Sequence, residues 1–160
     1  MYAEYHGPLV RLLTRRTGDP ARAEDLAQEV FVRAMESPPS NPRPWLFAVA
    51  LNLARDDGRK AIRQERHLAL FAAEQSGTSA PAPDQQVERN ERAAAVRAAL
   101  DALTETDRSA LLLKAEGCSY DEIASALGLA KGAIGTTLAR ARRRLVEAYR
   151  AREGTGDGAR

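Results

Sequence analysis

The chain has 160 residues, of which 29% are charged, and its formal net charge of +2 shows that it is not a general polycation. Its single cysteine, Cys118, excludes an intramolecular disulfide, and its two histidines, His6 and His67, form no cluster with metal-ligand spacing. No apolar run approaches the ~20 residues that span a bilayer, and the N-terminus lacks a signal-peptide pattern. We therefore expect a cytoplasmic protein of one or two domains, with no metal or cofactor.

Apolar periodicity predicts three helices in the first 71 residues. The first covers residues 2–17. The second covers residues 20–36 and is opened by Asp19 as N-cap and by Pro20 at the first helical position. A proline-rich segment follows, and a third helix then runs to about Leu70. The predicted core residues of these helices are Leu9, Val10, Leu12, Leu13, Ala23, Leu26, Ala27, Val30, Phe31, Ala34, Trp45, Leu46, Val49, Ala50, Leu53 and Ile62.

The second and third helices carry opposite charges on their exposed sides. Asp25, Gln28 and Glu29 lie away from the apolar stripe of the second helix, which suits either a basic protein partner or a solvated face near the helix dipole. Gly58 interrupts the third helix at a cost of about 1 kcal/mol against alanine, which a kink or a close contact would explain. The basic residues in the second half of this helix are Arg55, Arg59, Lys60, Arg63 and Arg66.

A change of composition divides the chain. Residues 72–87 are small, polar or proline, and they predict a flexible linker between a first domain at 1–71 and a second at 88–150. The glycine-rich segment 151–160 predicts a disordered tail. Because no strand pattern reaches a convincing length, we predict an all-α fold of two small helical domains.

Two helices open the second domain. The first has an apolar stripe of Val96, Leu100 and Leu103. The next is opened by Thr104 and Asp107, whose spacing predicts a capping box. It ends at a glycine, after which the remaining helices of the domain begin.

The second domain ends in a helix-turn-helix pattern between Ser119 and Leu145. Ser119 and Glu122 form a predicted capping box, Gly128 ends the first helix, and a basic second helix starts near Lys131. This arrangement is typical of DNA-binding domains, whose second helix lies in the major groove; the alternative is an ordinary helical hairpin with a solvated charged face. The candidate DNA contacts are Lys131, Thr136, Thr137, Arg140, Arg142, Arg143 and Arg144.

The order of these motifs resembles that of the bacterial RNA polymerase sigma factors of the extracytoplasmic-function (ECF) type, within the sigma-70 family. The segments that carry the resemblance are AEDLAQEVFVRAM, PWLFAVALNLARDDGRK, a flexible linker and ALTETDRSALLLKAEGCSYDEIASALGLAKGAIGTTLARARRRL. The resemblance extends from about Tyr5 to Tyr149. It implies two helical domains, a first that binds core RNA polymerase and the −10 promoter element, and a second that reads the −35 element.

The resemblance also implies roles for particular residues. Asp25, Gln28 and Glu29 match the motif that holds the clamp helices of the largest polymerase subunit. Contacts to −10 DNA would come from Asn52, Arg55, Arg59, Lys60 and Arg63. In the second helix of the helix-turn-helix, Lys131, Thr136, Thr137 and Arg140 would reach base edges or nearby phosphates, and Arg142, Arg143 and Arg144 would contact the DNA backbone. An anti-sigma factor is a further partner that the family implies.

Several positions depart from the family pattern. Ala130 replaces a common proline, and Gly135 and Thr137 replace longer side chains, so we expect weaker readout by side chains. Leu51 and Gly58 are similar departures in the first domain. Two further residues are assigned structural roles, Cys118 because no second cysteine can pair with it and Trp45 because its helical register matches the core.

Other function classes fit the sequence less well. A stand-alone helix-turn-helix regulator that binds duplex DNA as a dimer is the main alternative to a sigma factor. A helical interaction protein is a third hypothesis. An enzyme is not indicated, because the sequence shows no paired carboxylates, nucleophile–base pattern or phosphate-binding loop.

Overall fold

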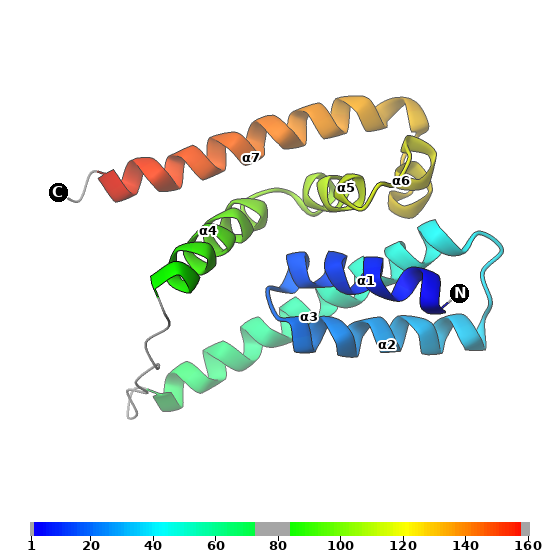
Figure 1. The fold of residues 1–160 in the computed structure, drawn as a ribbon, viewed down its shortest axis with the longest axis horizontal. Coiled ribbons are helices and arrows are strands. Elements are labelled where there is room, and N and C mark those ends of the chain that lie inside the picture. Colours follow the sequence, from blue (N-terminus) through cyan, green and yellow to red (C-terminus); the bar gives the residue numbers. More distant parts are fainter. Residues whose placement is uncertain (1, 73–83, 158–160) are drawn as a thin grey trace.

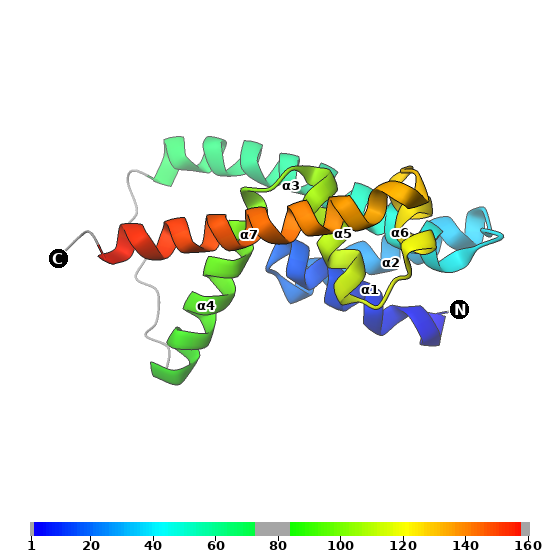
Figure 2. The same cartoon turned by 90° about the horizontal axis from the view of Figure 1, so that it is seen from above.

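The computed structural model describes the backbone of residues 2–72 and 84–157, and the side chains of residues 2–59 and 89–154. Within these residues the chain is helical, with no strand, so the predicted all-α class is confirmed (Figures 1 and 2). The elements are α1 (Tyr2–Thr17), α2 (Pro20–Glu36), α3 (Pro42–Ala72), α4 (Asp84–Asp101), α5 (Glu105–Ala115), α6 (Tyr120–Leu127), the 3-10 turn η1 (Lys131–Ala133) and α7 (Ile134–Asp157).

Helix bounds differ from the predictions at two places. Helix α4 begins at Asp84, inside the segment predicted as a linker, whereas residues 73–83 of that segment lie outside the described part of the chain. Helix α7 continues to Asp157 and so includes most of the segment predicted to be a disordered tail.

Helices α1, α2 and α3 form the N-terminal module, and their caps follow the predictions. Gly18 ends α1 with a φ of 76°, a left-handed conformation that glycine adopts without steric cost. The Asp19 side chain accepts hydrogen bonds from the backbone N–H groups of Ala21 and Arg22, at the start of α2. The three helices bury Leu9, Leu12, Leu13, Ala23, Ala27, Val30, Ala34, Leu46 and Ala50 in a common core.

Helices α4 to α7 form the C-terminal module. Its core includes Ile123 from α6 and Ile134 and Leu138 from α7, all fully buried, while α4 packs on α7. The predicted stripe on α4 was wrong in one respect, because Val96 is exposed and Ala99, three residues later, is buried in its place. The buried face of this helix therefore differs from the face that its larger apolar residues predict.

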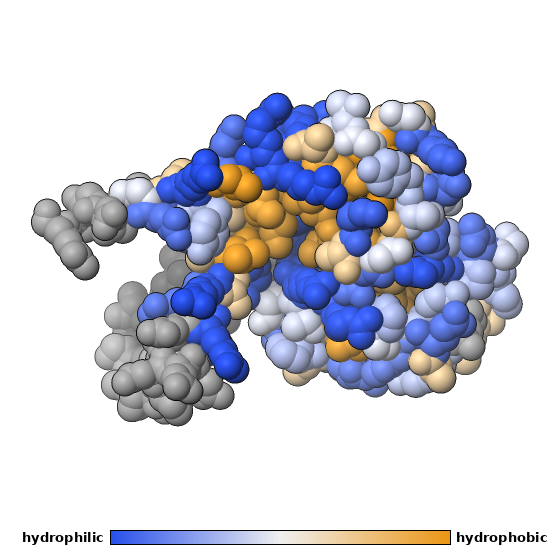
Figure 3. Space-filling view, turned by 45° about the horizontal axis from the view of Figure 1, so that its top comes forward, coloured by the Kyte–Doolittle hydropathy of each residue, from blue (hydrophilic) through white to orange (hydrophobic). Residues whose placement is uncertain are grey.

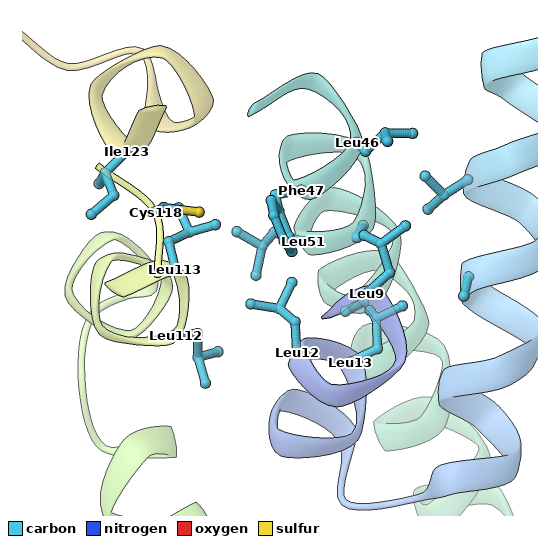
Figure 4. Close-up of a cluster of buried hydrophobic side chains, with 14 of the residues drawn as sticks. Leu9, Leu12, Leu13, Leu46, Phe47, Leu51, Leu112, Leu113, Cys118 and Ile123 are labelled. Atoms are coloured by element: carbon cyan, nitrogen blue, oxygen red, sulfur yellow. The ribbon is translucent and has the colours of Figure 1, made fainter. Parts of the chain in front are cut away.

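The two modules pack against each other through one continuous apolar core (Figure 4). Helix α3 contacts α6, and α1 contacts α5. Figure 4 shows Leu113 and Cys118 from the C-terminal module close to Phe47 and Leu51 from the N-terminal module. Phe47 and Leu51 are absent from the predicted core, because the helical stripe of α3 that faces α1 and α2 was identified and the stripe that faces the other module was not.

Ion pairs surround this apolar contact. The Glu116 side chain, only 3% exposed, lies 2.8 Å from Arg15 and 3.3 Å from Arg11 of α1. Arg43 of α3 donates a hydrogen bond of 3.0 Å to the backbone carbonyl of Glu116 and lies 3.4 Å from the carboxylate of Glu122. These pairs add directionality to the apolar contact and fix one arrangement of the two modules.

The surface of the molecule is largely polar. Figure 3 shows hydrophilic side chains over most of one face, with hydrophobic ones gathered in a strip near its middle. Trp45 lies at the edge of the core, where it lines a cavity of about 320 Å³ together with Ser125 of α6. The tryptophan therefore sits at the boundary between the modules.

Candidate nucleic-acid and polymerase interface

The helix-turn-helix is built from α6, η1 and the start of α7. Ser119 and Glu122 form the predicted capping box. The Glu122 backbone N–H donates to Ser119 Oγ at 3.1 Å, and the Ser119 backbone N–H donates to Glu122 Oε1 at 2.9 Å. Gly128 ends α6 with a φ of 67°. The second helix begins with a 3-10 turn at Lys131 and becomes α-helical at Ile134, so the sequence placed its start correctly but not its first turn.

A buried carboxylate holds this second helix against α5. Asp107 has no exposed surface, and its oxygens lie 2.8 Å from Arg140 Nη2 and 3.0 Å from Arg144 Nη1. The predicted capping box of Thr104 and Asp107 is therefore only half formed. Thr104 accepts the Asp107 N–H at 3.2 Å, but the Asp107 side chain is directed to α7. The prediction failed because the sequence does not show which residues α7 brings near.

The electrostatics of this cluster favour the charged carboxylate. Burial by itself raises the pKa of Asp107, but the hydrogen bonds and positive charges of Arg140 and Arg144 outweigh burial and lower the pKa below its ordinary value. The same contact raises the pKa of Arg140. Arg140 and Arg144 are thus bound to a carboxylate, and they hold the orientation of α7 in addition to presenting charge.

The remaining candidates on this helix divide by exposure. Thr137 is only 5% exposed, and its hydroxyl donates a 2.8 Å hydrogen bond to the Ala133 carbonyl, so its side chain is not presented to solvent, and its DNA contact stays a prediction. Thr136 is exposed one position earlier, on the side that faces solvent. Lys131 is exposed and lies 3.1 Å from Asp121. Arg142 and Arg143 are exposed, with no ion pair among the described side chains.

The predicted DNA face of α3 borders the C-terminal module, and of its described residues Asn52 is exposed and Arg55 half-buried. Asn52 and Arg55 line a cavity of about 150 Å³ whose other walls include Thr106 and Ser109 of α5 and Leu127 of α6. Arg59 is exposed. The side chains of Lys60 and Arg63, also predicted to contact DNA, lie outside the described residues.

The predicted polymerase-binding residues share one face of α2. Asp25, Gln28 and Glu29 are all exposed, whereas Ala27 and Val30 of the same helix are fully buried. Glu29 is partly neutralised by Arg33, 3.2 Å away and four positions later. The face is therefore open to solvent, acidic and supported by a packed core.

Cys118 lies in the core between the modules. It is 2% exposed, and burial raises the pKa of its thiol, an effect that the nearby Arg43 only partly offsets. A thiol with a raised pKa reacts slowly with oxidants, because the thiolate is the reactive form. This placement agrees with the structural role expected for Cys118.

Sequence reasoning missed Asp107 as a positioning residue. A signal for it exists: Arg140 and Arg144 lie one helical turn apart on α7, and such a pair can hold a single carboxylate on a neighbouring helix. The sequence does not say which of the module's carboxylates takes that place.

An all-α fold with a helix-turn-helix, a basic second helix and a separate acidic helix face defines a DNA-binding protein with a second, protein-binding surface. Family models match both modules: "Sigma-70 region 2" matches residues 1–66, and "Sigma-70, region 4" matches residues 93–145. The chain belongs to the ECF group of RNA polymerase sigma factors, in the sigma-70 family. None of the helices in the described residues combines the length and apolar character needed to cross a bilayer.

Named relatives agree with this assignment. The ECF RNA polymerase sigma factor EcfG of Rhodopseudomonas palustris (strain TIE-1) is 38% identical over 135 residues, which are 81% of this chain and 72% of that protein. The ferric citrate uptake sigma factor FecI of Escherichia coli (strain K12) is 30% identical over 146 residues, 88% of this chain and 84% of that protein. The sigma factor RpoE of Bartonella quintana, solved in complex with the anti-sigma factor NepR, superposes with a TM-score of 0.60 at 25% identity, covering 93% of this chain and 94% of that one.

Proposed function

We propose that this chain acts as an ECF-type sigma factor, which binds core RNA polymerase and directs it to promoters without catalysis of its own. The observation that carries the proposal is the presence of both sigma-70 regions in one chain, in the order that promoter recognition requires. A stand-alone helix-turn-helix dimer would need no acidic α2 face and no region 2. Core polymerase and promoter DNA are therefore the partners, and an anti-sigma factor like that of the Bartonella relative is a third.

Polymerase docking is assigned to α2. Asp25, Gln28 and Glu29 form an exposed acidic surface on a helix that the N-terminal core holds rigidly. Such a surface suits a basic partner, and a rigid helix needs little ordering when it binds. The short distance between Glu29 and Arg33 leaves Asp25 as the carboxylate most available to a partner.

Promoter duplex is assigned to the exposed side of α7. Lys131 and Thr136 lie at the N-terminal end of the recognition helix, where side chains reach base edges. Arg142 and Arg143 lie two turns later and are suited to phosphate contacts. Arg140 and Arg144 contribute charge from fixed positions, because Asp107 holds them.

Full contact of −10 DNA with Arg55 calls for a change in how the modules are arranged. Asn52 and Arg59 are exposed, whereas Arg55 is half-buried and shares a cavity with α5 and α6. Separation of the modules would also expose Leu51 and Phe47. Burial of these two side chains therefore stabilises the packed arrangement in the free chain. Polymerase binding through α2 leaves this interface untouched and so can precede the separation.

Run-off transcription with core polymerase on a library of promoters tests the proposal. We expect a promoter-dependent transcript, co-elution with core polymerase, and reduced co-elution when Asp25→Asn and Glu29→Gln are combined. Glu36→Gln, an exposed carboxylate at the end of the same helix, is the matched control and should leave co-elution unchanged. Tight binding of a palindromic DNA site by a dimer, without any polymerase-dependent transcript, would instead support the stand-alone regulator.

A further inference from the structure

A cleft rich in arginine lies where the two modules meet, away from the α2 and α7 surfaces assigned above, and it includes Arg55 and Arg59 of the predicted −10 face. It has a volume of about 610 Å³ and is lined by parts of α1, α2, α3, α4 and α5. Its walls carry six arginines and only three carboxylates, a formal surplus of three positive charges. The arginines are Arg16, Arg22, Arg55, Arg59, Arg97 and Arg108, and the carboxylates are Asp57, Asp101 and Glu105.

Three of the arginines have buried nitrogens without a partner. The Nε atoms of Arg16, Arg55 and Arg108 are inaccessible to solvent and have no hydrogen-bond acceptor in the structure. A buried donor left unsatisfied costs free energy, and charged donors cost more than neutral ones. All three arginines belong to the lining of the same cleft, so the protein around it only partly satisfies their guanidinium groups.

The carboxylates already present do not satisfy the site. Arg108 pairs with Glu105 and lies 3.2 Å from Asp101, and Arg16 lies 3.6 Å from Glu105. Arg22 pairs with Asp57. Burial, and after it the positive charge of Arg108, lower the pKa of Arg16, although Glu105 and Asp101 act in the opposite direction.

Within the part of the chain that the structure describes, three of the six arginines are not paired with a carboxylate and are available to a ligand. Arg55, Arg59 and Arg97 form no ion pair with any carboxylate among the described side chains. The Arg97 guanidinium, from α4, lies against the turn between α1 and α2, where a Cβ at Gly18 would collide with it. Gly58 lines the same cleft, and a Cβ built there meets no heavy atom within 4 Å, so the close contact considered for this glycine is absent.

We propose that this cleft binds a small anion that carries a diphosphate group. Phosphate oxygens accept several hydrogen bonds at once, and guanidinium groups match them in pairs, so one diphosphate can serve several arginines. The volume is within the range of small-molecule sites and exceeds the need of a single phosphate. Duplex DNA is a poorer fit, because these arginines line a cleft of about 610 Å³ and not an extended surface.

The bound anion has a consequence for the arrangement of the modules. Arg16 and Arg55 come from the N-terminal module, whereas Arg97 and Arg108 come from the C-terminal module. A ligand that contacts both stabilises the packed state, since it loses half of its contacts on separation. This effect on promoter binding rests on the proposed function, but the binding of the anion does not.

Isothermal titration calorimetry on the full chain, without polymerase or DNA, tests the proposal directly. Inorganic pyrophosphate is the probe, at constant ionic strength, with inorganic phosphate and ADP as further arms. We expect Arg97→Gln to weaken pyrophosphate binding by about tenfold, because it removes a charged hydrogen bond and no existing ion pair. The matched control, Arg89→Gln, changes the same charge at an exposed position of α4 outside the cleft and should bind as the wild type does.

A second pair of variants distinguishes binding in the cleft from a general effect of the protein's charge. Gly58→Glu adds a carboxylate at the wall of the cleft without a clash and should abolish binding, whereas Gly58→Gln adds a neutral side chain of similar size and should retain it. ADP binding more tightly than pyrophosphate supports a nucleotide as the natural occupant, and equal binding supports a free diphosphate. Equal pyrophosphate affinity in all five proteins, or no heat above that of sodium sulfate at matched ionic strength, overturns the proposal.

Discussion

The basic faces of α3 and α7 have similar composition but different surroundings. On α7, Arg142 and Arg143 are exposed and unpaired among the described side chains, while Arg140 is held by Asp107. On α3, Arg55 is half-buried and shares a cavity with α5 and α6, whereas Asn52 and Arg59 are exposed. The basic face of α7 is therefore open to solvent in the free chain, whereas the basic face of α3 is open only in part, because Arg55 lies beside the C-terminal module.

This difference shows that a basic residue in a sequence can occupy at least three different environments in the folded chain. It can stay open to solvent, bind a buried carboxylate, or line a contact between modules. Only a basic side chain that is open to solvent matches the expectation that it contacts a phosphate. The predictions that follow begin with the carboxylate that holds α7 and then test the contact between the modules and the orientation of the recognition helix.

Replacement of Asp107 by asparagine should have the largest effect on stability. The buried carboxylate is the shared partner of Arg140 and Arg144, and loss of its charged hydrogen bonds to both should cost about 3 kcal/mol. We expect the midpoint of urea unfolding at pH 7 to fall accordingly. Asp121→Asn, which breaks only the exposed pair with Lys131, should change the free energy of unfolding by no more than about 0.5 kcal/mol.

The pH dependence provides an independent test of the same cluster. Because the pKa of Asp107 is lowered in the folded chain, its contribution to stability is fully present above the unfolded-state pKa of about 3.9 and is lost as the pH falls through the folded-state pKa. The stability difference between the wild type and Asp107→Asn should therefore shrink in that acid range. A difference that stays constant down to the lowest pH at which the wild type is folded would show that Asp107 acts by packing alone.

Replacement of Leu51 by alanine should weaken the contact between the modules. Leu51 is 4% exposed and lies against the C-terminal module, so truncation removes about 2 kcal/mol of packing from the packed state. Trp45, the only tryptophan of the chain, shares a cavity with Ser125 of α6, and its fluorescence emission should shift to longer wavelength as the modules separate. We also expect tighter binding of −10 single-stranded DNA.

Leu13→Ala is the control for this prediction. Leu13 is fully buried in α1, so its truncation lowers stability without directly loosening the contact with the other module. The fluorescence emission of Trp45 in the Leu13→Ala variant should match that of the wild type below the unfolding transition. The same red shift in both variants would mean that Leu51 supports the N-terminal core and does not hold the modules together.

Local chemistry explains what could be predicted from the sequence. The caps at Asp19 and Ser119, the glycine that ends α6 at Gly128 and the exposed face of α2 depend on neighbours within a few positions, and they were predicted correctly. The packing of Phe47 and Leu51 against the other module was not, since it joins helices far apart in the chain and leaves no periodic signal beyond a second apolar stripe. The site showed the same limit, because exposure could be judged from helical register but a distant partner could not.

Thr136 and Thr137 offer the finest test of how the recognition helix is oriented. Thr137→Val removes a buried hydroxyl that donates to the Ala133 carbonyl within the helix, so we expect a loss of no more than about 1 kcal/mol in stability and unchanged promoter preference. Thr136→Val leaves stability unchanged but removes an exposed hydroxyl at the end of the helix that meets base edges, and should relax preference at one base pair by about 1 kcal/mol. Promoter-library transcription compares the two variants at every position of the −35 element. A change of preference in Thr137→Val but not in Thr136→Val would mean that the helix turns about its axis when it binds DNA.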